Sequence, residues 1–199
     1  MRTNPVGKGI VNEKELLVDA LRRLNRVGLP YMLTGSMASN YWGIPRTTHD
    51  LDFVIQLPAA GIPKMMQEFG GDLSLDEESM HAAFRPPYQF NAIDTRSALK
   101  IDFWMARPVA FDQEMFRRRM KVVVFGEPAW IATKEDVILH KLCWNQITPS
   151  ERQLGDAAGI VAIQREHLDL DYLKRWAAEL GVGRFLEKLL DGTIKPKTT

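Results

Sequence analysis

The stretch "TGSMASNYWGIPRTTHDLDFVI", residues 34–55, places two aspartates, Asp50 and Asp52, in a run that otherwise has the composition of a buried strand. Aspartate is depleted in strands, and a buried unpaired carboxylate is costly. Successive strand residues point to opposite faces, so both aspartates are expected to share one face while Leu51 and Phe53 point into a core. Neighbouring carboxylates repel each other unless a cation neutralises them. The stretch therefore predicts either a cation beside this pair or a structure other than a buried strand.

A third acid has the same setting. Asp102 lies in "KIDFWMA", residues 100–106, between apolar residues of another expected strand. If the two strands are neighbours, Asp102 reaches the same point as Asp50 and Asp52. Mg²⁺ takes oxygen ligands, and three convergent carboxylates can hold two metal ions for in-line phosphoryl or nucleotidyl displacement. The predicted catalytic and metal-binding residues are therefore Asp50, Asp52 and Asp102, with Mg²⁺ or Mn²⁺ as the metal.

Upstream of the acids, Gly35 and Ser36 join a short apolar strand, "YMLT", to the expected short helix "SMASNYWG". Glycine lets the backbone approach a ligand closely, and the start of a helix offers unpaired N–H groups to an anion. We expect Ser36 both to cap this helix and to donate its hydroxyl to a phosphate. Gly-Ser alone is a weak signal, but together with the later acids it predicts a site for a nucleoside triphosphate with magnesium.

Helix and strand patterns extend over most of the remaining chain. A helix is expected from the N-cap Asn12, with Glu15 in the reciprocal capping position, to the stop at Gly28. A further helix is expected over about 61–69. The run "FDQEMFRRRMKVVVFG", residues 111–126, predicts a helix that leads into a strand, and Gly126 and Pro128 are expected to end that strand.

From Ala132 onward the pattern is helical, with Thr133 and Ser150 as expected N-caps and a frayed tail from Asp191. We therefore predict an α+β fold. It consists of a small mixed sheet flanked by helices at residues 1–130, followed by an all-helical C-terminal part at residues 131–199.

The composition is that of a folded globular chain, with 45% hydrophobic and 26% charged residues among 199. A net charge of +1 argues neither for nor against nucleic acid, since a local basic groove can exist within a neutral total. The single cysteine, Cys143, excludes an intrachain disulfide and a multi-cysteine zinc site. No apolar run is long enough to span a bilayer, and residues 1–17 lack the apolar core of a signal peptide, so we expect a cytoplasmic protein without a membrane partner.

The segments "LTGSMASNYWG" and "RTTHDLDFVI" resemble the signature of the polymerase-beta-like nucleotidyltransferases. That signature is Gly-Ser after a strand, then two acids one residue apart, then a third acid on a later strand. The matching positions here are Gly35, Ser36, Asp50, Asp52 and Asp102. The run from Arg46 to Asp52 is most similar to the abortive-infection-type branch of bacterial toxin–antitoxin systems, in which Arg-x-Thr commonly precedes the paired acids.

The helical part resembles the same branch in "TKEDVILHKLCW" and "SERQLGDAAGI". Lys141 and Asp156 match a helix-borne lysine and a later aspartate. The resemblance implies that Lys141 binds the triphosphate and that Asp156 orients this lysine or the acceptor. Arg46 is a further candidate for contact with the nucleotide phosphates. Members of the branch often carry arginine directly before the late aspartate, where this chain has Gly155.

Each of these residues also has a purely structural interpretation. Asp50 and Asp52 could be solvated acids on an edge strand, and Asp102 could pair with Lys100 or an arginine. Lys141 could be a surface lysine, and Arg46 could form a loop salt bridge. The basic run from Arg117 to Lys121 is more typical of a solvated helix face than of an RNA contact.

The leading hypothesis is a metal-dependent transferase that moves a nucleoside monophosphate from an NTP to an acceptor hydroxyl. The resemblance implies a toxin with tRNA or a protein as acceptor and a cognate antitoxin as partner. One alternative is a binding module that holds an NTP or a partner without turnover. Another is a small-molecule nucleotidyltransferase acting on an aminoglycoside-like compound, which an acidic acceptor pocket in the helical half would favour.

Overall fold

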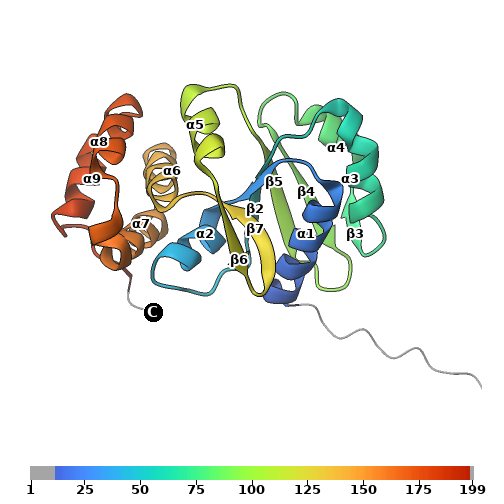
Figure 1. The fold of residues 1–199 in the computed structure, drawn as a ribbon, viewed down its shortest axis with the longest axis horizontal. Helices are drawn as coiled ribbons and strands as arrows, with labels where there is room; N and C mark the ends of the chain where they lie inside the picture. The colour runs from blue at the N-terminus through green and yellow to red at the C-terminus, as the bar shows by residue number, and fades with distance from the viewer. Residues whose placement is uncertain (1–11, 198–199) are drawn as a thin grey trace, which may run out of the picture.

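The computed structural model describes residues 12–197, which form a mixed sheet with helices on both faces (Figure 1). The seven strands of the described residues lie in the order β3-β4-β5-β2-β1-β7-β6. Their bounds are β1 Tyr31–Leu33, β2 Leu51–Ile55, β3 Leu73–Leu75, β4 Gln89–Asp94, β5 Lys100–Met105, β6 Met120–Val124 and β7 Glu127–Ile131. The predicted α+β fold is confirmed.

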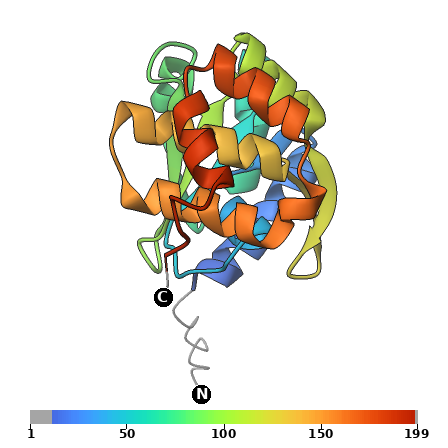
Figure 2. The ribbon, with the colours of Figure 1, turned by 90° about the vertical axis from the view of Figure 1, so that its left-hand side faces the viewer.

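Two groups of helices cover the sheet (Figure 1). On one side lie α1 Glu13–Val27, α3 Ile62–Phe69 and α4 Glu77–Ala82. On the other side lie α2 Gly35–Trp42, α5 Ala110–Arg118, α6 Lys134–Ile147, α7 Glu151–Gln164, α8 Leu170–Glu179 and α9 Gly183–Leu190. Two short 3₁₀ turns, Ala59–Gly61 and Arg165–His167, complete the elements. Within the described residues every regular element after β7 is helical, as predicted, and these helices lie together on one side of the sheet (Figure 2).

The helix ends are set by the expected capping residues. Asn12 and Glu15 form a reciprocal capping box at the start of α1, and Gly28 ends that helix in the left-handed conformation with φ of 71°. The side chain of Thr133 accepts a hydrogen bond from the Asp136 N–H at the start of α6, and Ser150 does the same for α7. Such caps satisfy the N–H groups that a helix leaves unpaired in its first turn.

Strands β2 and β5 are parallel neighbours at the centre of the sheet, and Asp52 lies directly beside Asp102 in their register. The alternating residues point to the other face, where Phe53 and Phe103 stack with ring centroids 5.9 Å apart. Phe69 of α3 packs edge-on against Phe103, so this face forms a dry aromatic core. Burial of this face fixes the register, and with it the position of both acids on the opposite face.

Three strands and one α-helix were not predicted: β3, β4, β7 and α4. In β4 the inward positions are Phe90, Ala92 and Asp94. Because the third of these is an aspartate, the sequence does not show the regular alternation of apolar residues that marks a strand. The expectation that Pro128 ends a strand is wrong. Gly126, with φ of 86°, turns the chain between β6 and β7, and Pro128 lies within β7 opposite Val123.

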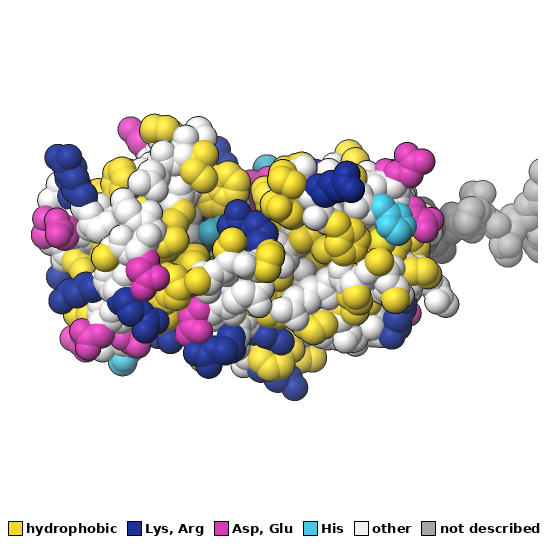
Figure 3. All heavy atoms as spheres, turned by 90° about the horizontal axis from the view of Figure 1, so that it is seen from above, with side chains coloured by type: hydrophobic (Ala, Val, Ile, Leu, Met, Phe, Trp, Pro, Cys, Tyr) yellow, Lys and Arg dark blue, Asp and Glu magenta, His cyan; other side chains and the backbone are white. Residues whose placement is uncertain are grey.

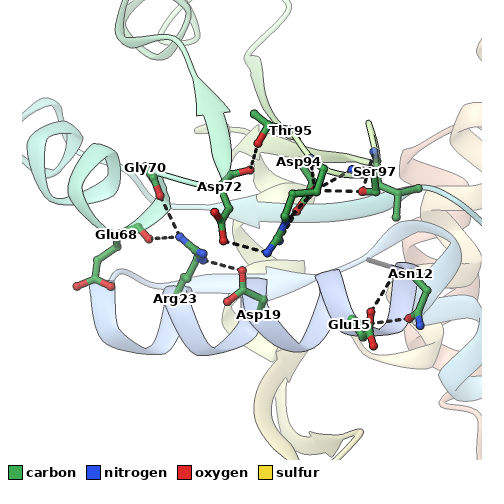
Figure 4. A network of polar contacts seen from close by, with 12 residues as sticks. Asn12, Glu15, Asp19, Arg23, Glu68, Gly70, Asp72, Asp94, Thr95 and Ser97 are labelled. Atoms are coloured by element: carbon green, nitrogen blue, oxygen red, sulfur yellow. Dashed lines mark hydrogen bonds and ion pairs between the residues drawn. The ribbon is translucent and has the colours of Figure 1, made fainter. Parts of the chain in front are cut away.

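Polar contacts around two arginines lie side by side, one between α1 and the end of α3 and the other at the outer strands of the sheet (Figure 4). Arg23 of α1 bonds Asp19 and the carbonyl oxygens of Glu68 and Gly70. The fully buried Asp94 accepts hydrogen bonds from Arg96, whose guanidinium also contacts Asp72 at 2.9 Å. The hydrogen bond from Arg96 is the main reason that the pKa of Asp94 falls to about 2. This network explains how a charged residue is accommodated inside β4.

Replacement of Asp94 with asparagine is expected to lower the free energy of unfolding by about 3 kcal/mol, because it leaves a partly buried guanidinium without its main partner. Since the folded pKa of Asp94 lies below its unfolded value, its contribution is complete above about pH 4 and is lost as the pH falls toward about 2. Urea unfolding at pH 7 and pH 3 measures both effects. Asp72→Asn is the matched control and should cost less. An equal loss of unfolding free energy in the two variants would contradict the role of Asp94 as the main partner of Arg96.

Some predictions fall at the chain ends. Residues 1–11, in which no signal-peptide core was found, and residues 198–199 of the tail lie outside the described residues. The start of the tail is less frayed than expected, since the N–H of Ile194 bonds the carbonyl of Lys188 at 2.9 Å. No helix within residues 12–197 combines the length and the apolar character that crossing a membrane requires.

Candidate active site

The first part of the site is a pair of carboxylates on adjacent strands. Asp52 and Asp102 lie side by side in the parallel register of β2 and β5, as predicted for neighbouring strands. Asp50 precedes the first residue of β2 and is exposed. Among residues 12–197 no three His, Cys, Asp or Glu side chains are arranged to hold a metal ion by themselves. The acids that the fold brings together are therefore a pair, with the third at its edge.

The surroundings of Asp52 disfavour the ionised form of its carboxylate. Its burial raises its pKa, and the neighbouring charges of Asp102 and Asp50 raise it further. The indole N–H of Trp104, which donates to Asp52 Oδ1 at 3.3 Å, and the charge of Lys141 oppose that shift. The net direction is upward, so the protein by itself does not fully compensate the charge.

Asp102 is only half satisfied. Its Oδ2 pairs with the ammonium group of Lys100 at 2.9 Å, which is the structural ion pair considered as the alternative to catalysis. Its Oδ1 is buried and has no hydrogen-bond partner. A buried carboxylate oxygen without a hydrogen-bond partner is costly. Here it lies beside Asp52, whose pKa is raised. The two carboxylates together fit a divalent cation, which takes one or two carboxylates and fills its remaining positions with phosphate oxygens and water.

The second part of the site is the start of α2. Gly35 has φ of 62°, and a Cβ built on it would lie 2.1 Å from Asp52 Oδ2. Only glycine therefore allows the backbone to lie this close to the carboxylate. The first N–H groups of α2 are free of intrahelical partners and suit an anion at this position.

The expectation that Ser36 caps α2 is wrong. Thr34 occupies the cap position, without a side-chain hydrogen bond, and Ser36 lies inside the helix. The Ser36 hydroxyl instead accepts a hydrogen bond from Arg46 at 2.9 Å. The left-handed turn at Gly35 places the cap two residues earlier than expected, at Thr34 and not at Ser36, which the sequence pattern did not reveal.

The third part of the site is a cationic cluster around Asp156. Arg46 contacts both oxygens of Asp156, at 2.7 and 2.8 Å, and Lys141 Nζ contacts Oδ2 at 2.8 Å. These bonds join the loop before β2, α6 and α7. The loop salt bridge considered for Arg46 is thus present, and Lys141 is buried rather than on the surface.

The cluster carries more positive than negative charge, because Arg46 and Lys141 both contact the single carboxylate of Asp156. Burial alone would raise the pKa of Asp156, but the hydrogen bonds from Arg46 and Lys141 outweigh it and hold that pKa below its usual range. Burial lowers the pKa of Lys141, and Asp156 and Asp52 oppose the shift. The surplus positive charge lies within electrostatic reach of Asp52, so Lys141 links this cluster to the carboxylate pair.

Other candidates from the sequence are explained by local contacts. Arg117 pairs with Glu114 at 2.7 Å, Arg118 lies over the Tyr172 ring, and Arg119 lies over Phe116. The three arginines of the basic run are therefore engaged in the protein's own contacts. Burial raises the pKa of the Cys143 thiol to about 11, which keeps it protonated and unreactive.

One residue of the site was missed by sequence reasoning. Trp104 donates its indole N–H to Asp52 Oδ1. The alternation of β5 contained the signal, because Trp104 lies two residues after Asp102 and must share its face.

Comparison with known proteins supports the fold. No family model matches the chain, and no curated protein matches its sequence. The structure of ANT(2'')-Ia in complex with adenylyl-2''-tobramycin is 14% identical, covers 86% of this chain and 98% of that chain, and has a TM-score of 0.57. An antigenic nucleotidyltransferase-like protein from Paracoccidioides brasiliensis is 14% identical, covers 94% of each chain, and has a TM-score of 0.53.

The solution structure of the antibiotic-resistance factor ANT(2'')-Ia is also 14% identical, covers 90% of each chain, and has a TM-score of 0.51. Likeness at this identity concerns the fold alone. The chain therefore has a nucleotidyltransferase-like fold.

Proposed function

We propose that this chain is a metal-dependent nucleotidyltransferase, which moves a nucleoside monophosphate from an NTP to an acceptor hydroxyl. The observation that carries the proposal is the juxtaposition of Asp52 and Asp102 on parallel neighbouring strands, with one buried oxygen unpartnered. Directly beside them, Gly35 opens α2 with its backbone against Asp52. Carboxylates beside an anion-binding helix start are what a triphosphate–cation complex requires.

A divalent cation, Mg²⁺ or Mn²⁺, held by Asp52 and Asp102 with Asp50 at the edge, would supply neutralisation of phosphate charge. The residues of the chain have complementary roles. The backbone at Gly35 and Ser36 binds the phosphates, and Lys141 adds positive charge next to them. Arg46 reaches the same point through its contact with Ser36 Oγ at 2.9 Å. Positioning and charge neutralisation are the main demands of phosphoryl transfer.

The transfer involves one bond formed and one bond broken. The acceptor hydroxyl oxygen attacks the α-phosphorus of the NTP, and the bond from that phosphorus to the bridging oxygen breaks. Pyrophosphate leaves with the bonding electron pair, and the hydroxyl proton passes to a carboxylate. Asp102 suits this last role because its Oδ1 accepts no hydrogen bond while Lys100 holds its Oδ2.

Membership of the abortive-infection-type branch, and with it a toxin role beside an antitoxin, is supported by the Arg46-to-Asp52 run and by Lys141 and Asp156. The structure gives these motif residues a common contact, since Arg46 and Lys141 share the carboxylate of Asp156. An acceptor in tRNA or protein belongs to this branch-level proposal.

NTPs labelled at either the α-phosphate or the γ-phosphate test the proposed function, because only the α-phosphate is transferred. With Mg²⁺ and cell lysate, label from the α-phosphate is expected to appear on an acceptor, and label from the γ-phosphate in pyrophosphate. EDTA should abolish both, because the paired carboxylates would lose their cation. The label on the acceptor is followed by chromatography and scintillation counting. Appearance of γ-label on the acceptor, or tight NTP binding without transfer, would contradict the proposal, and the second outcome would identify a binding module.

A further inference from the structure

Next to the carboxylate pair is an apolar pocket of about 640 Å³. It lies at the ends of β2 and β5, beneath α5, α6 and α8, and its walls include Val54, Trp104, Phe111, Cys143, Trp144 and Trp176. Seen from above, hydrophobic side chains lie among charged side chains of both signs on the surface of the molecule (Figure 3). The volume falls in the usual range for small-molecule sites, about 300–1,000 Å³.

The pocket and the carboxylates share one face of the sheet. Val54 lies two residues beyond Asp52, and Trp104 lies two residues beyond Asp102, so all four side chains project from the same side. Trp104 is a wall common to both sites, since its indole N–H contacts Asp52 while its ring lines the pocket. Helix α6 also serves both, with Lys141 toward Asp156 and Trp144 in the pocket.

The position of the pocket identifies which reactant it holds. In-line displacement places the attacking and leaving oxygens on opposite sides of the phosphorus. The phosphate-binding backbone at Gly35 lies beside Asp52 near the first residues of β2, so the leaving pyrophosphate belongs there. The pocket lies beyond the acids, toward the last residues of β2 and β5. A hydroxyl held in the pocket would approach from this second side.

The chemistry of the pocket is aromatic and nearly neutral. Trp104 and Trp144 meet edge to face with centroids 5.7 Å apart. The carboxylate of Asp112 at the wall is neutralised by Arg107 at 2.6 Å. His140 accepts from the Trp144 indole through Nε2, which leaves Nδ1 as its donor, and burial lowers the pKa of His140 to about 4. The wall thus offers aromatic surface and a neutral imidazole.

We infer that this pocket is the acceptor subsite of the proposed transfer, and that it takes a small hydroxyl compound carrying a flat, largely apolar ring. The inference rests on the proposed nucleotidyl transfer. It adds an acceptor class that replaces the tRNA or protein acceptor implied by the branch resemblance. The ring packs against Trp104 and Trp144. The hydroxyl then lies toward Asp102, which takes its proton as the oxygen bonds to the α-phosphorus and pyrophosphate departs.

The same lining disfavours other acceptors. A polycationic aminoglycoside needs several free carboxylates, whereas Asp112 is already paired and Glu179 is the remaining acid of the wall. An RNA strand needs phosphate contacts beyond its terminal base. The basic run of α5 does not supply them freely, since Arg117 pairs with Glu114 and Arg119 lies over Phe116 and Trp130.

A transfer assay with defined acceptors tests the inference. The full chain is given Mg²⁺ and the four α-labelled NTPs, together with 4-nitrophenyl β-D-glucoside, adenosine or pyridoxine as ring-bearing alcohols. Tobramycin and a short RNA hairpin are tested in parallel. We expect label on a ring-bearing alcohol. Trp144→Leu should raise the KM for that alcohol on the order of 10-fold with kcat little changed and the KM for NTP unaltered.

Two further variants separate binding from folding. Trp130→Leu is the matched control, because Trp130 lies in β7 outside the pocket, and it should leave the acceptor KM unchanged. Ile147→Arg alters an exposed side chain at the pocket mouth, which the fold tolerates, and should also raise the acceptor KM. Label on tobramycin or RNA but on none of the alcohols would overturn the inference and leave the proposed function standing. Absence of transfer to every acceptor, lysate included, would overturn both.

Discussion

Asp52→Asn is expected to reduce nucleotidyl transfer on the order of 10³-fold or more. The substitution keeps the shape of the side chain and removes one of the two charges that would hold the cation. The measurement is the rate of α-label transfer at saturating NTP and Mg²⁺. Asp171→Asn, in the exposed first turn of α8, is the matched control and should transfer at the rate of the unaltered chain.

The same variant has a predictable effect on stability. Burial and the neighbouring carboxylates raise the folded pKa of Asp52, so its charged form disfavours folding. The unaltered chain therefore loses stability as the pH rises through that raised pKa, and Asp52→Asn does not. In EDTA the Tm of the variant should equal or exceed that of the unaltered chain at pH 8, with a smaller difference at pH 4. A variant that is inactive and also less stable in EDTA would assign Asp52 a structural role instead.

Gly35→Ala is expected to reduce transfer on the order of 10²-fold or more and to lower stability. The new Cβ would lie 2.1 Å from Asp52 Oδ2, so either the carboxylate or the start of α2 must move. A displacement of about 1 Å at a reacting group can cost about 10²-fold in rate. Alanine at positive φ adds about 1 kcal/mol of backbone strain. Rates of label transfer and urea unfolding measure the two effects separately.

Gly28→Ala is the control that distinguishes strain from displacement. Gly28 has a similar φ of 71°, and a Cβ there would meet no atom within 4 Å. It should therefore lose comparable stability while transfer proceeds at the normal rate. Equal loss of transfer in both variants would show that general destabilisation, rather than the approach of Gly35 to Asp52, is responsible.

Much of the fold was predictable where local chemistry is strong. The capping box at Asn12 and the stop at Gly28 define α1 by contacts within a few residues, and Thr133 does the same for α6. The missed strand β4 depends on Asp94, whose burial is possible only because Arg96 binds it across the following turn. The pairing of β7 with β1 likewise follows from contacts distant in sequence. Neither the contact of Arg96 with Asp94 nor the pairing of β7 with β1 can be recognised from a local hydrophobic pattern.

In the candidate site, too, features set by neighbouring residues were predictable, and features set by contacts distant in sequence were not. The alternation around Asp52 and Asp102 predicts that each points away from the core, and their pairing followed once the strands were taken as neighbours. The partner of Arg46 lies 110 residues away at Asp156, beyond the reach of any local pattern. The helix cap at Ser36 was predicted wrongly because the positive φ of Gly35 moves the helix start.

Mn²⁺ located by its anomalous scattering, in a crystal of the chain with a non-hydrolysable NTP analogue, tests the central claim most directly. We predict a cation about 2.1 Å from carboxylate oxygens of both Asp52 and Asp102, with the triphosphate against the first turn of α2. A cation bound elsewhere, or a triphosphate distant from Gly35 with these two carboxylates left bare, would contradict the account.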